Sequence, residues 1–234
     1  MRSSKWQAAG NVYLLVERAE LGEPLSPQRA RELVGGSDGI LEVVSTETDE
    51  VEIVVWNPDG STAEMSGNGT RIAALWLAER TGAQTVRIRV GSRIVAARLL
   101  GGGEVEQEMG EFEVGPPERV DDVELVPVSV GNPHAVVRGD PNEIERIGPF
   151  LEGHPRFPSR TNVQVARVDG PGEVTARVWE RGVGETPSSG TSAIAVAAAT
   201  HGEGEVIVHF PGGDLRVRLA GGRAFLTGPV ERVE

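Results

Sequence analysis

The chain has 234 residues and a formal net charge of −12, and it is long enough to form one large or two modest domains around a buried core. The negative charge argues against nucleic acid or an anionic membrane surface as a partner, and no apolar run has the length of a membrane span or signal peptide. The chain has no cysteine, which excludes disulfides, zinc–thiolate sites and thiol catalysis and agrees with a cytoplasmic location.

Strands and helices alternate along the first half of the chain, with short turns rich in glycine and proline. The apolar periodicity predicts, in chain order, a strand over 11–17, a helix over 26–35 capped by Ser26, strands over 40–46 and 51–56, a helix from about 67 to 80, and a hairpin over 85–99 that turns at Gly91-Ser92. The acidic stretch 101–122 is expected to hold a last strand followed by a crossover.

The second half repeats this order of elements. The same signals predict strand-forming residues over 126–137, a helix over 142–151, strands over 160–168 and 174–179, a helix from about 190 to 200, and a hairpin over 205–219 that turns at Gly212-Gly213. Because a hairpin follows the helix in both halves, the repeat extends over a whole lobe and is not limited to a short motif.

A short segment makes the repeat most visible. In VEIVVWNPDGSTAEMSGNGT and in VTARVWERGVGETPSSGT, a strand-like run ends in tryptophan, and a Ser-Gly pair follows ten residues after that tryptophan, at Ser66 and Ser189. A repeat this regular predicts two pseudo-symmetric lobes of the α+β class, each a mostly antiparallel sheet wrapped around one central helix. We expect the lobes to cover residues 1–118 and 119–223, with the strand 224–234 as a candidate to complete the first lobe.

Asparagine gives an independent signal. Five of the six asparagines lie at strand ends or turns: Asn11, Asn57, Asn68, Asn132 and Asn162. Asparagine favours turns for local reasons, which is the alternative reading of any one position. Five such positions together favour contacts that converge on a polar ligand.

The segments GNVYLLVE, WNPDGSTAEMSGNGTR, VSVGNPHAVV, FPSRTNVQVARV, VWERGVGETPSSGTSA and FLTGP resemble those of the diaminopimelate epimerase family, within the pyridoxal-independent amino-acid racemases, over residues 10–230. The resemblance implies two lobes with the active site in the cleft, and two-base transfer of the α-proton that interconverts L,L- and meso-diaminopimelate for lysine and peptidoglycan-precursor biosynthesis. It implies a small amino-acid substrate, and a homodimer is left open. The sequence has no glycine-rich phosphate loop, metal-ligand cluster or nucleotide fingerprint, so we expect no cofactor and no metal.

The family's two catalytic cysteines would fall at Ser66 and Ser189. A thiol ionises near pH 8.5 and a serine hydroxyl is a far weaker acid, and a helix dipole worth about one pK unit does not close that gap. Three explanations stay open: the serines are engineered, the protein is a natural variant or a racemase of another amino acid that uses Glu180 or His134 as acid and base, or it is a relative that binds an amino acid without turnover.

The resemblance also implies a set of substrate-binding residues. Backbone N–H groups at the two helix starts would bind the α-carboxylate, Arg181 a distal carboxylate and Glu180 an ammonium group. The full set is Asn11, Asn57, Gly67, Asn68, Asn132, Asn162, Glu180, Arg181, Gly190 and Thr191. Ordinary helix caps and an exposed strand-end ion pair are the structural alternatives.

Overall fold

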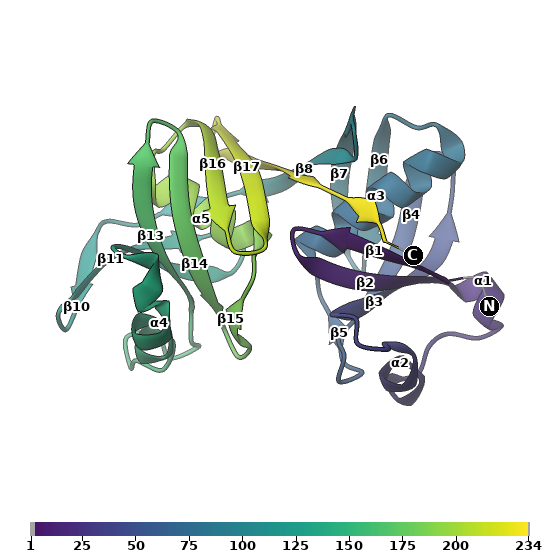
Figure 1. Cartoon of the computed structure of the whole chain (residues 1–234), viewed down its shortest axis with the longest axis horizontal. Coiled ribbons are helices and arrows are strands. Elements are labelled where there is room, and N and C mark those ends of the chain that lie inside the picture. The colour runs from purple at the N-terminus through teal and green to yellow at the C-terminus, as the bar shows by residue number, and fades with distance from the viewer. Residues whose placement is uncertain (1–2, 234) are drawn as a thin grey trace. The chain divides into compact units, whose positions relative to one another are not determined.

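The computed structural model describes residues 3–233, which form two compact units (Figure 1). Unit 1 runs up to Gln107 and resumes at Thr227, and unit 2 comprises Glu108–Leu226. These divisions fall within two strands, whereas the lobe boundaries expected from the sequence, after residue 118 and before residue 224, remain a prediction.

Unit 1 is a mixed sheet with one central helix. Its elements in chain order are β1 (Ser3–Ala8), β2 (Asn11–Glu17), α1 (Arg18–Leu21), α2 (Pro27–Leu33), β3 (Gly39–Thr46), β4 (Glu50–Trp56), β5 (Thr62–Ala63), α3 (Gly67–Thr81), β6 (Thr85–Val90), β7 (Arg93–Gly101), the first part of β8 (Glu104–Glu111), and β19 (Glu231–Arg232). The strands pair in the order β19-β1-β2-β3-β4-β6-β7-β8, and β5 pairs with the end of β4.

Unit 2 has the same plan. Its elements are the rest of β8, β9 (Glu113–Val114), β10 (Glu118–Val120), β11 (Val123–Ser129), β12 (Pro133–Arg138), the 3-10 turn η1 (Pro141–Glu143), α4 (Ile144–Glu152), β13 (Asn162–Gly170), β14 (Glu173–Glu180), β15 (Gly184–Thr186), α5 (Gly190–Thr200), β16 (Gly204–Phe210), β17 (Gly213–Ala220), and the first part of β18 (Arg223–Pro229). The main strand order is β9-β11-β12-β13-β14-β16-β17.

Strand direction alternates identically in the two units. Antiparallel and parallel pairs follow one another from β1/β2 to β6/β7, and again from β11/β12 to β16/β17. The two parallel pairs of each unit arise where a helix lies between the paired strands in the chain. The predicted α+β fold of two pseudo-symmetric sheet-and-helix lobes is confirmed.

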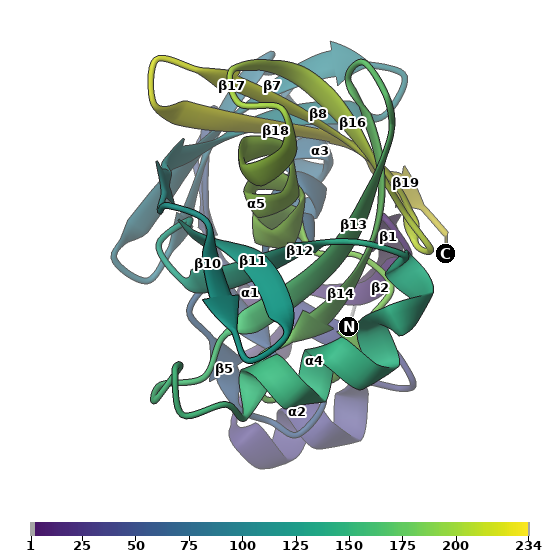
Figure 2. The same cartoon turned by 90° about the vertical axis from the view of Figure 1, so that its left-hand side faces the viewer.

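Each sheet curls around its central helix, which explains the composition of that helix. In unit 1, α3 packs on β1, β3, β4, β6 and β7, and its residues Ile72, Ala73 and Ala74 are fully buried. In unit 2, the strands β11–β14, β16 and β17 pack on α5, where every residue from Ser192 to Ala198 is buried (Figure 2). The middle of a helix that is enclosed on several sides has no polar face, and small residues let the strands approach it closely.

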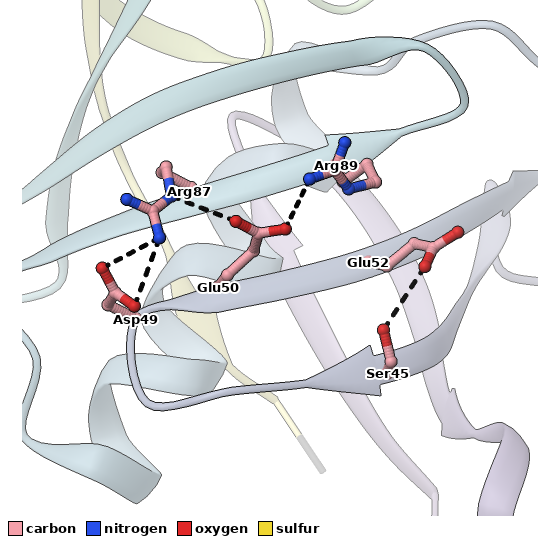
Figure 3. Close-up of polar contacts among 6 residues, drawn as sticks. All are labelled: Ser45, Asp49, Glu50, Glu52, Arg87 and Arg89. Carbon is pink, nitrogen blue, oxygen red and sulfur yellow. Dashed lines mark hydrogen bonds and ion pairs between the residues drawn. The ribbon is translucent and has the colours of Figure 1, made fainter.

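A row of charged side chains lies on β4 and β6 of unit 1 (Figure 3). Glu50 lies 2.7 Å from Arg89 and 3.1 Å from Arg87, and these hydrogen bonds lower the pKa of its carboxyl group. Arg87 also pairs with Asp49 at 3.3 Å, and Ser45 donates to Glu52 at 3.3 Å. Because water reaches these groups, they contribute little to stability, although they bridge the parallel pair of β4 and β6.

Most predicted elements are present, with differences at their ends. The helix beginning at Ser26 is confirmed, with the Ser26 hydroxyl accepting from the Arg29 N–H at 3.2 Å. The second hairpin turns at Pro211-Gly212, one residue earlier than predicted, since Phe210 pairs with Gly213. The stretch 101–122 was expected to hold one strand; it contains β8, β9 and β10, because β10 closes a hairpin with β11. None of the helices described is long and apolar enough to cross a membrane.

The enclosure of α3 makes a stability prediction. Ile72→Ala should lower the free energy of unfolding by about 2–5 kcal/mol, because Ile72 is 0% exposed and its neighbours cannot collapse into the cavity. Ile94→Ala is the matched control in the same unit: Ile94 is 52% exposed on β7, and its loss should change stability by less than about 0.5 kcal/mol. Urea unfolding compares the two, and equal losses would contradict the enclosed-helix packing.

Candidate functional site

Ser66 is the N-cap of α3, and its hydroxyl has two neighbours. Its backbone is extended, its Oγ accepts from the Gly69 N–H at 3.0 Å, and the same Oγ lies 2.9 Å from the Tyr13 hydroxyl. The side chain is half-buried. The serine hydroxyl therefore stands at the positive end of a long helix, within hydrogen-bond reach of a phenol.

A chain of side-chain hydrogen bonds lies next to Ser66. Arg71 donates to the Asn68 Oδ1 at 2.5 Å, and the Asn68 amide donates to the Asn11 Oδ1 at 2.5 Å. Since the Asn11 oxygen is already an acceptor, its NH₂ group remains to donate to another acceptor. Asn11 and Asn68, both predicted site residues, are thus brought together in unit 1.

Arg71 is a fully buried cation at this position. Its Nε and Nη1 have no hydrogen-bond partner among residues 3–233. Burial lowers the pKa of Arg71 to about 10, and the charge of Tyr13 opposes that shift. The guanidinium is still charged at neutral pH, so the site contains a desolvated positive charge with few partners.

Gln107 on β8 is hydrogen-bonded to the first turn of α3. Gln107 is fully buried, donates to the Gly67 carbonyl at 3.1 Å and accepts from Thr70 Oγ1 at 2.8 Å. The helix begins at Gly67, so the first N–H groups, at Gly67 and Asn68, lack intrahelical acceptors. These are the backbone donors that the sequence assigns to a carboxylate.

Asn57 is placed differently from the other predicted residues of unit 1. It lies in the turn between β4 and β5, where its Nδ2 donates to Ser61 Oγ at 2.9 Å and its N–H donates to the Ser61 carbonyl at 2.8 Å. Those contacts account for Asn57 as a turn residue. Its proposed contact with a ligand remains a prediction.

Ser189 occupies the equivalent position in unit 2 with a different environment. It is the N-cap of α5 with extended backbone, and its side chain makes no cap hydrogen bond. The helix begins at Gly190 and Thr191, and a Cβ at Gly190 would lie 2.7 Å from the Leu226 Cδ2. Glycine therefore lets the helix start pack against Leu226 while exposing its N–H groups.

His134 lies in a buried network of unit 2. Its Nδ1 is 3.0 Å from the Gln164 Nε2, which can only donate, so Nε2 of the ring carries the proton and donates to the Asn132 Oδ1 at 3.0 Å. Gln164 also donates to Ser192 on α5 at 2.9 Å. Burial lowers the pKa of His134 to about 3, so the ring is neutral and both its nitrogens are occupied.

Asn162, Glu180 and Arg181 lie together at the ends of β13 and β14. The Asn162 Oδ1 accepts from the Arg181 N–H at 3.0 Å, and its Nδ2 donates to the Pro133 carbonyl at 2.9 Å. Glu180 accepts from Thr186 at 2.7 Å, and burial raises the pKa of its carboxyl group. The Arg181 guanidinium is exposed and donates to the Ser159 carbonyl at 3.3 Å.

Sequence reasoning missed four residues of this arrangement: Tyr13, Arg71, Gln107 and Gln164. Tyr13 had a signal, because it follows Asn11 by two residues in GNVY as His134 follows Asn132 in GNPH. Arg71 and Gln164 lie inside a helix and a strand, where a polar residue gives no sign of which way it points. Within residues 3–233, no group of three or more acidic or histidine side chains is placed to hold a metal ion.

Comparison with known proteins places this architecture in a family of epimerases. The family model described as diaminopimelate epimerase matches residues 3–115 and 126–233. The chain belongs to the diaminopimelate epimerase family, which confirms the resemblance found in the sequence.

The sequences of individual relatives align with nearly the whole chain. A diaminopimelate epimerase from Synechocystis sp. is 34% identical, with 98% of this chain and 96% of the relative covered. One from Desulforudis audaxviator is 35% identical, covering 100% and 97%. That alignment runs over 275 positions, more than the 234 residues here, so this chain lacks segments that the relative has.

Solved structures share the fold at low identity. A predicted epimerase from Pseudomonas aeruginosa superposes with a TM-score of 0.72 at 16% identity, covering 100% of this chain and 97% of that one. A hydroxyproline epimerase from Agrobacterium vitis, solved with bound trans-4-hydroxy-L-proline, has a TM-score of 0.67 at 15% identity and covers 99% and 88%. At such identities the likeness concerns the fold alone.

The buried His134 predicts an acid-sensitive fold. The unfolded chain takes up a proton on this histidine near pH 6.5, whereas the folded protein does so only at about pH 3. Its contribution to stability is complete above pH 6.5 and is lost as the pH falls toward 3, amounting to about 2 kcal/mol between pH 7 and pH 5. Urea unfolding at the two pH values should show this loss in the parent and not in His134→Gln. The same loss in both would contradict it.

Proposed function

We propose that this protein is a cofactor-independent amino-acid epimerase that interconverts L,L- and meso-diaminopimelate in lysine biosynthesis, with Ser66 and Ser189 in the two acid/base positions. Membership of the family, with each serine at the N-cap of an enclosed helix, carries the proposal. The helix starts supply N–H groups suited to the α-carboxylate, and they stabilise the negative charge that develops when the α-carbon loses its proton.

The polar residues of each unit fit substrate-binding roles. Asn11 and Asn68, and Asn132 on the other unit, have amide orientations fixed by buried neighbours, so they are prepared to bind a ligand without reorganising. We assign the distal ammonium and carboxylate to Glu180 and Arg181, with Asn57 and Asn162 as further contacts. His134, neutral and fully bonded, is assigned the positioning of Asn132 rather than proton transfer.

A second candidate is an amino-acid-binding relative with little turnover, which the two serines favour. A hydroxyl needs a neighbouring base before it can remove a proton. If the protein is instead a racemase of another amino acid, Glu180 is a better candidate base than His134. Its carboxyl group is held beside Thr186 in a largely buried position, whereas both nitrogens of His134 are already hydrogen-bonded.

Restoring cysteine separates these candidates. Ser66→Cys combined with Ser189→Cys should raise solvent-deuterium exchange at the α-carbon of diaminopimelate by about 100-fold or more, because a thiolate is available near neutral pH and a serine alkoxide is not. The parent should bind diaminopimelate and exchange slowly. Ser45→Cys, which places a thiol on an exposed strand position, is the control and should leave the exchange rate unchanged.

Two other results would count against the epimerase. Binding of diaminopimelate without exchange in the double cysteine variant would favour the binding relative. Absence of both binding and exchange in every variant would contradict the choice of ligand.

Arg181 tests the identity of the ligand. Arg181→Lys keeps the charge and loses the planar fork, so it should weaken binding of diaminopimelate by about 1–3 kcal/mol. Binding of alanine, which has no distal carboxylate, should barely change. Calorimetric titration of both ligands decides the matter: equal losses would make Arg181 structural and leave the amino acid unspecified.

A further inference from the structure

The contact between Tyr13 and Ser66 joins two hydroxyl groups that are 53 residues apart in the sequence, with Oη and Oγ 2.9 Å apart. Tyr13 is the only tyrosine in the chain. A phenol ionises near pH 10, several units below an aliphatic hydroxyl, so it is the most acidic group found in contact with the Ser66 hydroxyl. Ser66 Oγ also accepts from the Gly69 N–H at 3.0 Å, which orients it at the helix start.

The fold holds the tyrosine ring in this position. Tyr13 is in register with Gly39 on β3 and with Trp6 on β1. A Cβ at Gly39 would lie 2.7 Å from the ring atom Cε1 and 2.7 Å from the Trp56 carbonyl oxygen, so only glycine leaves room for the ring beside β3. The phenol is therefore built into the sheet and directed at the N-terminus of α3.

The charges around Tyr13 favour its anionic form. Charged residues on the elements that neighbour Tyr13 are Lys5 on β1, Glu42 on β3, Asp38 before β3, and Arg71, Glu79 and Arg80 on α3. Of these, Arg71 interacts electrostatically with Tyr13. Asp38 is exposed and accepts from the Val12 N–H, so solvent screens it. Arg71 is fully buried and has two N–H-bearing atoms without partners. A phenolate on Tyr13 supplies the negative charge that this desolvated cation lacks.

We propose that Tyr13 is the proton acceptor for Ser66, so that the two hydroxyls together replace the missing thiolate of unit 1. In the forward step, Ser66 Oγ takes the α-proton of the amino acid while its own hydroxyl proton passes to the Tyr13 phenolate. The Cα–H bond breaks, its electron pair stays on the substrate, and one Oγ–H and one Oη–H bond remain. The reverse step returns the proton, so the pair needs no other reactant. This inference rests on the proposed epimerase function.

Unit 2 shows what the same position looks like without this arrangement. His134 follows Asn132 by two residues as Tyr13 follows Asn11, and both lie on a strand paired in parallel with the next one. His134 turns to Gln164 and Asn132, whereas Tyr13 reaches the helix-capping serine. The proton partner is thus a specific feature of unit 1.

The first test is a spectroscopic pH titration of the full-length, unsubstituted protein. Because Tyr13 is the only tyrosine, the near-ultraviolet tyrosinate absorbance reports it alone, and Tyr13→Phe provides the blank. We expect the absorbance to rise below about pH 10, and Arg71→Met to move the midpoint up by about one pH unit or more. Should Arg71→Met not fold, Arg71→Lys keeps the charge and should keep the parent's midpoint. A parent midpoint at or above pH 10 overturns the proposal.

The second test is a mutant cycle on α-deuterium exchange with diaminopimelate. Tyr13→Phe should slow exchange about 100-fold or more in the Ser66/Ser189 protein, and less than about threefold in the variant with cysteine at both positions, where a thiolate needs no phenol. The exchange rate of the parent should rise with pH up to the midpoint found by absorbance.

The outcomes separate this inference from the proposed function. Equal slowing in both backgrounds would make Tyr13 structural. Exchange in the cysteine variant with none in the serine protein would show that the Tyr13–Ser66 pair supplies no base. Absence of exchange in every variant would reject the epimerase itself, and the titration would still decide whether Arg71 favours a Tyr13 phenolate.

Discussion

The structure depends on the enclosure of a helix by a sheet, and each unit contains one such enclosed helix. The middle of an enclosed helix favours small or apolar side chains, and its buried polar groups gather in the first turns, where Asn68, Thr70 and Arg71 of α3 lie. The alanine-rich α5 and the buried middle of α3 follow from the first condition, and the serines at the N-caps follow from the second. Because buried Gln107 and Gln164 hold the first turns of α3 and α5, the N–H groups there are fixed in direction before any ligand arrives.

Replacing a thiol by a hydroxyl changes what the surroundings must provide. A cysteine at a helix N-terminus ionises with help from the dipole, whereas a serine needs a partner that takes its proton. The two units differ on this point. Ser66 has a phenol in contact, next to a buried guanidinium, while Ser189 makes no side-chain cap hydrogen bond. The two serine positions are therefore chemically unequal, although the folds around them are alike.

Much of the fold could be predicted because its determinants are local. The equal Trp-to-Ser spacings, the strand periodicities and the Ser26 cap each operate within about ten residues, and the corresponding elements are present. The short edge elements could not be predicted: β1 carries the polar sequence SSKWQA and forms because β2 and β19 pair with it. The Tyr13–Ser66 contact could not be predicted for the same reason, since it depends on strand register and on the space that Gly39 leaves for the tyrosine ring.

Pseudo-symmetry also shows where the two units have diverged. Gly39 and Asn162 occupy equivalent positions at the start of β3 and β13, since the residue after each pairs with the tryptophan near the end of the next strand, Trp56 or Trp179. Where unit 1 leaves space for an aromatic ring, unit 2 places an amide that binds Arg181 and Pro133. The shared backbone thus holds an aromatic side chain in one unit and a hydrogen-bonded amide in the other. Equivalent positions of the repeat therefore differ in chemistry although their strand register is the same, because register fixes where a side chain begins and not which side chain it is.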